Sequence, residues 1–149
     1  MPRLLHLYAT IATCVLLDFL WFKVVMVHLV NWPISYQHGP PVWSWALAYY
    51  LLQSAGILYF AVYPSAISGR GRVAAYNGAR WGLFIHLVYE FPHYATLSSW
   101  PFTVLLADVF WGVFAGGVAG LLSFKIGAWL RVYPVSPEAI PPVSRGFWE

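Results

Sequence analysis

Three acidic side chains lie inside long apolar stretches of the sequence, where a charged group is energetically unfavourable unless it has a partner. Asp18, Glu90 and Asp108 are three of the five acids in the chain. A carboxylate in hydrocarbon costs about 3 kcal/mol or more, so such a group usually faces the interior of a helical bundle and has a partner there. Acids that share a site cannot all stay ionised. At least one of the three is therefore expected to hold a proton at neutral pH.

Two histidines flank one of these acids at helical spacing. His86 precedes Glu90 by four residues and His93 follows it by three, so Glu90 and His93 form a Glu-x-x-His motif. Carboxylate-bridged metal sites in helical bundles use this spacing, and they normally use it twice. Because the chain contains the motif once, two interpretations stay open: a metal site held by His86, Glu90 and His93, or polar histidines satisfied by neighbouring helices. The identity of any cofactor stays open as well.

Other polar and aromatic side chains accompany the acids. Gln53 is a strongly polar residue in an otherwise apolar segment, and we expect it to hydrogen-bond across helices or to join the acids as a binding residue. Asp18 and Asp108 each begin an Asp-x-x-Trp sequence, which ends at Trp21 and Trp111. The indole then lies one helical turn from the carboxylate, where it can shield the acid or donate a hydrogen bond.

Glycines recur every four residues in the same stretches as two of the acids. Small residues at this spacing let helices approach closely inside a membrane. The acids that continue the spacing are therefore expected to face helix contacts rather than lipid. The two series are Gly78 and Gly82, which lead to His86 and Glu90, and Gly112, Gly116 and Gly120, which continue from Asp108.

The composition indicates that membrane-spanning helices position these residues. Of the 149 residues, 60% are hydrophobic and only 9% are charged, whereas a soluble domain carries about a quarter charged residues. Such a surface suits lipid rather than water. The basic residues form no stripe or run, which argues against nucleic-acid binding.

The apolar segments predict an all-α fold, a four-helix transmembrane bundle in a single domain that covers residues 1–131. Each segment is long enough to cross a bilayer, and polar, glycine-containing or proline-containing connections separate them. A proline-rich tail without periodicity follows at 132–149, and we expect it to be extended. The predicted helices cover about 4–30, 43–63, 73–97 and 102–129.

Positive charges indicate how the bundle is oriented. The first and third connections contain no Lys or Arg, and Lys23 is the one cation near their side. Positive charges mark the cytoplasmic side, so the sequence predicts that both ends of the chain are cytoplasmic. The charges on that side are Arg3, Arg70, Arg72, Lys125, Arg131 and Arg145.

The three acids fall at a similar depth in this arrangement. Glu90 lies seven residues before the end of its predicted helix, and Asp108 lies seven residues after Pro101. At 1.5 Å per residue, both are about 10 Å below the outer border. Asp18 is also in the outer half of its helix, so a shared layer of three carboxylates is geometrically possible.

Several short motifs surround the acids and run in order through the four segments. They are Leu17-Asp18-Phe19-Leu20-Trp21, Leu58-Tyr59-Phe60-Ala61-Val62 with Pro64, Tyr89-Glu90, Ala95-Thr96-Leu97, Trp100-Pro101 and Asp108-Val109-Phe110-Trp111-Gly112. With this pattern, the chain from about Leu4 to Leu122 resembles the uncharacterised bacterial membrane-protein family catalogued as domain of unknown function 2177. The resemblance implies a four-helix fold in the bacterial inner membrane and no assigned activity. Where the family usually has Tyr-Asp-Leu-Thr-Asn, this chain has Tyr89-Glu90-Phe91-Pro92-His93.

Three functions from different classes are compatible with these residues. The first-ranked hypothesis is a non-catalytic accessory or assembly subunit of a larger membrane complex, because the chain is small and lacks a complete catalytic constellation. The second is a proton-linked small-solute carrier or binding protein that uses the carboxylates. The third is a membrane metalloenzyme, which we favour least. The expected partners are membrane lipid, and either other membrane proteins or further copies of the chain.

Overall fold

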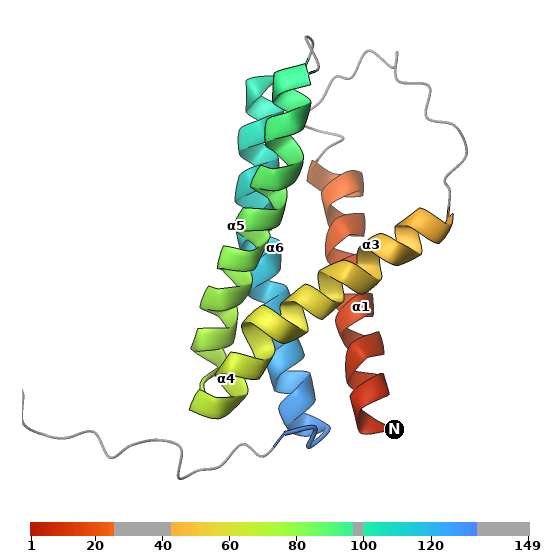
Figure 1. Cartoon of the computed structure of the whole chain (residues 1–149), viewed down its shortest axis with the longest axis vertical. Helices are drawn as coiled ribbons and strands as arrows, with labels where there is room; N and C mark the ends of the chain where they lie inside the picture. Colours follow the sequence, from red (N-terminus) through yellow and green to blue (C-terminus); the bar gives the residue numbers. More distant parts are fainter. Residues whose placement is uncertain (26–42, 97–99, 134–149) are drawn as a thin grey trace, which may run out of the picture.

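The computed structural model describes residues 1–25, 43–96 and 100–133, and nearly all of them are helical (Figure 1). No strand occurs in these three ranges, which confirms the predicted all-α fold with four long helices. In chain order, the elements are α1 (Pro2–Leu20), the π-helical η1 (Trp21–Val25), α3 (Trp43–Gly56), the π-helical η2 (Ile57–Val62), α4 (Tyr63–Ser68), α5 (Gly71–Thr96) and α6 (Phe102–Trp129).

Three of the four long helices have the length and the apolar composition needed to cross a membrane. They are Pro2–Val24, Trp43–Ser68 and Phe102–Trp129. α5 has a similar length of 26 residues, but it is less apolar. The contact between α5 and α6 is the most extensive one between helices in the described structure. Packing against α6 therefore shields α5 from lipid along one side.

The second long helix, α3–η2–α4, extends past its proline. The sequence places the end of this helix at Tyr63, but the structure continues it to Ser68. It ends at Gly69, whose φ of 65° is a left-handed conformation that glycine adopts without strain. η2 widens the helix just before the proline, where the N–H of Tyr63 bonds to the carbonyl of Leu58. Pro64 then stands in the first turn of α4, where its missing N–H costs little.

The other predicted helix ranges agree closely with the structure. α6 has the bounds predicted from the sequence, and α5 begins two residues earlier and ends one residue earlier than predicted. The first predicted helix agrees with α1 and η1 as far as Val25. Its last residues, 26–30, lie outside the described ranges, as does most of the predicted tail, 134–149.

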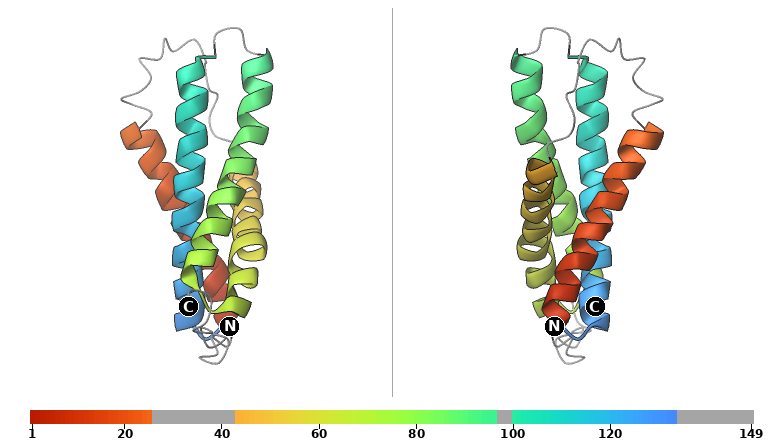
Figure 2. Two further views of the ribbon diagram at one scale, coloured as in Figure 1. Left: turned by 90° about the vertical axis from the view of Figure 1, so that its left-hand side faces the viewer. Right: turned by 90° about the vertical axis from the view of Figure 1, so that its right-hand side faces the viewer.

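Glycines face one another across the contact between α5 and α6. A Cβ on Gly82 would overlap the carbonyl oxygen of Gly112, and a Cβ on Gly116 would overlap that of Gly78. The two helices therefore approach until one backbone meets the other, a packing that only small residues allow. Figure 2 shows that α5 and α6 diverge beyond this contact, towards the turn that joins them.

Buried polar side chains hold α1 against α6 near the start of the chain. The His6 ring donates from Nε2 to the carbonyl oxygen of Ser123 at 2.8 Å. The hydroxyl of Thr10 donates to the carbonyl oxygen of His6 at 2.9 Å and lies 2.5 Å from the hydroxyl of Ser123. All three side chains are buried, so water does not compete for these hydrogen bonds.

The four long helices alternate in direction, so each connection between them lies at one end of the bundle or the other. The N-terminus, the connection between α4 and α5, and the C-terminal end of α6 lie at one end (Figures 1 and 2). The turn between α5 and α6 lies at the other end. Residues near the α5–α6 turn and residues near the N-terminus therefore face opposite sides of a membrane.

Candidate functional site

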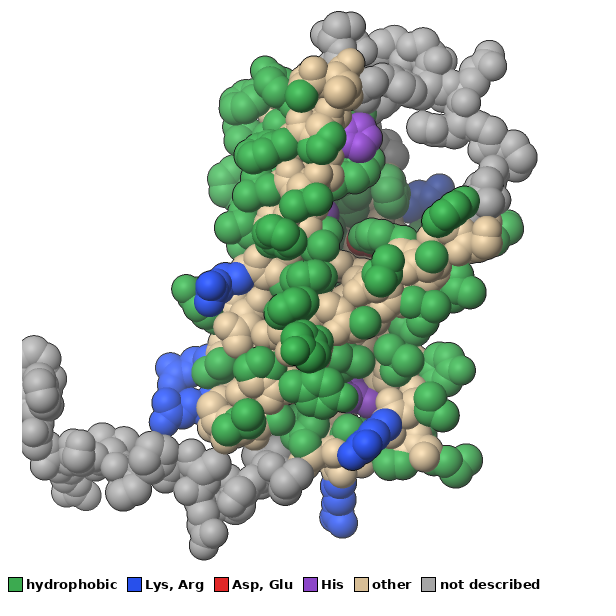
Figure 3. Space-filling view, viewed as in Figure 1, with side chains coloured by type: hydrophobic (Ala, Val, Ile, Leu, Met, Phe, Trp, Pro, Cys, Tyr) green, Lys and Arg blue, Asp and Glu red, His purple; other side chains and the backbone are tan. Residues whose placement is uncertain are grey.

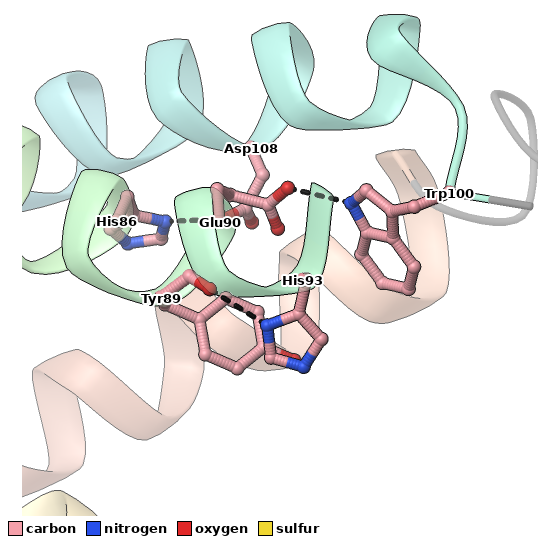
Figure 4. Close-up of polar contacts among 6 residues, drawn as sticks. All are labelled: His86, Tyr89, Glu90, His93, Trp100 and Asp108. Atoms are coloured by element: carbon pink, nitrogen blue, oxygen red, sulfur yellow. Dashed lines mark hydrogen bonds and ion pairs between the residues drawn. The ribbon is translucent and has the colours of Figure 1, made fainter. Parts of the chain in front are cut away.

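A hydrogen bond between His86 and Asp108 joins α5 to α6 just beyond the glycine contact. Nδ1 of His86 lies 2.7 Å from Oδ2 of Asp108 (Figure 4). Both side chains are largely buried, so the bond is strong, and it is an ion pair when the imidazole is protonated. Gly112, one turn along α6 from Asp108, makes the room: a Cβ there would overlap the His86 ring.

Glu90 lies one turn further along α5, and only 1% of its surface is exposed. Its Oε2 accepts a hydrogen bond of 2.7 Å from the indole N–H of Trp100 (Figure 4). Trp100 lies just before α6, so this bond links the last part of α5 to the start of α6, where the two helices diverge. Asp108 and His86 are close enough to interact electrostatically with Glu90.

Asp18 joins these groups from α1. Its carboxylate lies near the hydroxyls of Tyr50 and Tyr49 on α3, and it is close enough to His86 and Asp108 to interact with them electrostatically. His86 and Asp108 are thus each close to both Asp18 and Glu90. We call Asp18, His86, Glu90 and Asp108 the carboxylate cluster; α1, α5 and α6 supply its members, and α3 supplies the tyrosines.

The two Asp-x-x-Trp sequences meet between α1 and α6. Trp21 stacks on Trp111, with ring centroids 5.3 Å apart and an angle of 27° between the rings. Trp21 is buried, so the stack contributes apolar burial as well as ring contact. The two aspartates lie one helical turn from the stacked rings, which explains how acids from α1 and α6 come to share a level.

His93 lies outside the carboxylate cluster, although it follows Glu90 by three residues. Its Nδ1 donates to the carbonyl oxygen of Tyr89 at 2.7 Å, and its ring lies 4.2 Å from the Tyr89 ring (Figure 4). Within the described ranges, no group of three His, Cys, Asp or Glu side chains is arranged to hold a metal ion. His86, Glu90 and His93 therefore do not come together as a metal-binding triad.

Gln53, the remaining candidate, has a buried side-chain oxygen. This Oε1 has no hydrogen-bond partner among the residues that the structure describes. The neighbouring Ser54 is also buried and donates a weak hydrogen bond of 3.9 Å to the sulfur of Cys14. Gln53 thus leaves an acceptor available inside the helical bundle.

A second polar cluster, nearer the N-terminus, was not among the candidates from the sequence. Tyr133 completes it: the phenol donates to the carbonyl oxygen of Phe124, and its ring lies 6.2 Å from the ring of His6. Burial raises the pKa of Tyr133 to about 12, so this donor keeps its proton at neutral pH. The position was predicted to belong to the tail, but the side chain packs onto α6. The members of this cluster are His6, Thr10, Ser123 and Tyr133.

A pattern in the sequence could have revealed part of this second cluster. His6, Thr10, Cys14 and Asp18 follow one another at four-residue intervals, which puts them on one face of α1. This face packs on α6 and α3 in the structure. A search for acidic residues finds Asp18 on this face but passes over His6 and Thr10, two members of the second cluster. The contribution of Tyr133 has no comparable signal, because it lies after the last helix.

The carboxylate cluster combines three carboxyl groups with one imidazole in a partly buried region. If every acid ionised, negative charge would exceed positive charge where the dielectric is low, which is strongly unfavourable. Holding a proton on at least one of the acids relieves this excess.

Comparison with known proteins bears on the whole of this region. No curated protein and no solved structure matches the chain. The family described as "Predicted membrane protein (DUF2177)" matches residues 4–125, most of the chain. That range includes every member of the carboxylate cluster and both glycine series. The chain therefore belongs to this family of predicted membrane proteins.

Proposed function

We propose that the chain is a proton-linked binding protein or carrier for a small solute, with the carboxylate cluster as its site. The observation that supports this most is the convergence of Asp18, His86, Glu90 and Asp108 from three helices. A carboxyl group that gains or loses a proton changes its attraction for a charged or hydrogen-bonding solute. Proton binding and solute binding at one cluster are then linked by thermodynamic necessity.

The proposal includes an orientation in the bacterial inner membrane with both ends of the chain in the cytoplasm. It is supported by the basic residues at the end that holds the N-terminus, because positive charges favour the cytoplasmic side. Glu90 and Trp100 are near the α5–α6 turn, at the opposite end. The proton and the solute would therefore enter the cluster from the outer side.

The second candidate function is the accessory or assembly subunit, and a different observation supports it. Two acids of the cluster already have hydrogen-bond partners within the chain, His86 for Asp108 and Trp100 for Glu90, and the third, Asp18, lies near the tyrosines of α3. A purely structural role, in which the acids hold the helices together, is sufficient to explain hydrogen-bonded acids of this kind. The metalloenzyme hypothesis has no such support, because no metal-binding triad forms among the described residues.

Proton flux into lipid vesicles tests the first proposal. The protein is reconstituted with a pH-sensitive dye inside, a pH gradient is imposed, and its decay is compared with that in empty vesicles. We expect the wild type to speed the decay, and Asp108→Asn and Glu90→Gln to return it to the rate of empty vesicles. Thr13→Val is the matched control, because the Thr13 hydroxyl bonds to the Ala9 carbonyl on its own helix. Equal flux in all four proteins would refute the proposal.

Native mass spectrometry of the protein, extracted in mild detergent from its own membranes, tests the second candidate. Other subunits in fixed ratio would support an accessory role, and the neutralised variants should then weaken assembly. A chain that arrives alone, or only with copies of itself, would count against that role. The two experiments are independent, so each candidate can fail without the other.

A further inference from the structure

Five basic side chains surround one end of the bundle, opposite the α5–α6 turn. They come from three separate places in the chain: the start of α1, the connection between α4 and α5 with the first turn of α5, and the end of α6 with the residues just after it. All five are exposed. Figure 3 shows Lys and Arg side chains gathered around the lower end of the molecule. We call this set the basic end; it consists of Arg3, Arg70, Arg72, Lys125 and Arg131.

The basic end has no negative charge of its own among the described residues. The acids in those ranges are Asp18, Glu90 and Asp108, and all three belong to the carboxylate cluster. No ion pair with any of the five cations occurs in the described structure. The first turns of α1 and α5, which point their positive dipole ends this way, also lack acids. Among the residues that the structure describes, no acid therefore neutralises this positive charge.

One of these cations occupies a backbone position that suits glycine. Arg131 has a φ of 54°, a left-handed conformation just after the end of α6. The N–H of Val132 bonds to the carbonyl of Gly127, as in the motif that normally places glycine at this point. An arginine there costs stability that a glycine would not. An interaction of the Arg131 side chain with a molecule other than this chain would account for an arginine at this position.

The position of the basic end along the bundle identifies the kind of anion. The apolar spans Pro2–Val24 and Phe102–Trp129 begin and end at this level, so it coincides with the surface of a bilayer. Trp129, 81% exposed, lies two residues before Arg131 and has the character of an interfacial anchor. The anions concentrated at that depth are lipid phosphates.

We propose that the basic end binds the headgroups of anionic phospholipids, and that Arg131 is retained for this contact at the expense of fold stability. The proposal does not depend on the carboxylate cluster, and either can fail alone. A cation near a membrane surface contributes about five-fold in affinity for anionic lipid. Removing two cations should therefore weaken the preference for such lipid by roughly 25-fold.

Spin-labelled lipids provide the test. The protein is reconstituted in phosphatidylcholine, and the association of trace labelled phosphatidylglycerol is compared with that of labelled phosphatidylcholine. We expect the wild type to prefer phosphatidylglycerol and the Arg70→Gln/Arg72→Gln variant to lose most of that preference. Arg80→Gln is the matched control, because Arg80 lies further along α5 over the Tyr76 ring and away from the basic end. Equal preference in the wild type and the double variant would overturn the proposal.

Two further measurements separate lipid binding from a purely structural arginine and from a site for free phosphate. Arg131→Gly should raise resistance to unfolding and at the same time lower the preference for phosphatidylglycerol; a rise in stability with the lipid preference unchanged would overturn the role of Arg131. Inorganic phosphate added to vesicles that contain labelled phosphatidylglycerol should leave the preference intact at matched ionic strength. Displacement by inorganic phosphate under those conditions would identify a free-phosphate site and overturn the assignment to lipid.

Discussion

Replacing Gly112 by alanine should break the hydrogen bond at the centre of the carboxylate cluster. A Cβ on Gly112 would overlap Cγ and Cδ2 of the His86 ring. The ring cannot keep its place, and moving it lengthens the 2.7 Å bond to Asp108. Gly117, on the same helix, supplies a matched control. A Cβ there would lie 3.4 Å from the Ala75 carbonyl oxygen and 3.6 Å from the Ala79 side chain, which are ordinary contacts.

The expected change in the free energy of unfolding for Gly112→Ala combines two opposing contributions. Loss of a buried hydrogen bond to a charged group costs about 1.5–3 kcal/mol. Alanine in place of glycine inside a helix returns about 0.5–1 kcal/mol. Gly112→Ala should therefore lower the free energy of unfolding by about 0.5–2.5 kcal/mol. Gly117→Ala should raise the free energy of unfolding by about 0.5–1 kcal/mol, because it gains the helix preference of alanine and breaks no hydrogen bond.

Unfolding by a denaturing detergent, followed by circular dichroism, measures both variants. A double-mutant cycle with His86→Ala separates the steric effect from any other, because removal of the ring leaves room for the new Cβ. The cost of Gly112→Ala should disappear in the His86→Ala background. A cost that persists there, or an equal gain from Gly112→Ala and Gly117→Ala, would refute the proposed packing of His86 over Gly112.

Three further variants probe the remaining contacts by the same unfolding measurement. Gly82→Ala should cost about 3 kcal/mol, because its Cβ would meet a backbone carbonyl of α6 that cannot rotate away; a neutral effect would contradict the close approach of α5 and α6. Trp100→Phe leaves the buried Glu90 without its indole donor and should cost about 1–3 kcal/mol; no change would mean that Glu90 finds another donor. Thr10→Val removes the hydroxyl facing Ser123 and should cost about 1 kcal/mol, and a loss well below that would assign little stability to the second polar cluster.

The sequence predicts the helices well because membrane-spanning segments are long and their composition is extreme. The bounds of α6 agree to the residue, since Pro101 precedes it and Arg131 and Pro134 follow it closely. The second long helix is the main difference. Pro64 indicates a helix end by its missing N–H, but the π-helical turn of η2 absorbs that loss and the helix continues. Such a local rearrangement has no signature in hydropathy.

The candidate site is only partly predictable, for a geometric reason. Spacing along a helix shows that His86, Glu90 and His93 lie close in sequence, but not which of them turns towards α6. The structure places His86 on Asp108 and turns His93 back to the carbonyl of Tyr89. That choice depends on Gly112 of α6, which leaves space for the His86 ring. Contacts of this kind depend on the partner helix and not on the spacing alone.

Infrared titration of the carboxyl groups in lipid tests most directly whether the carboxylate cluster is one site. Protonated and ionised carboxyl groups absorb at different frequencies, so proton occupancy can be followed against pH in the wild type and in Asp108→Asn. If the acids are coupled through Asp108, as their electrostatic contacts indicate, its removal changes how Asp18 and Glu90 titrate. If both remaining acids titrate in the variant as they do in the wild type, the acids are independent, and a shared proton-binding site is contradicted.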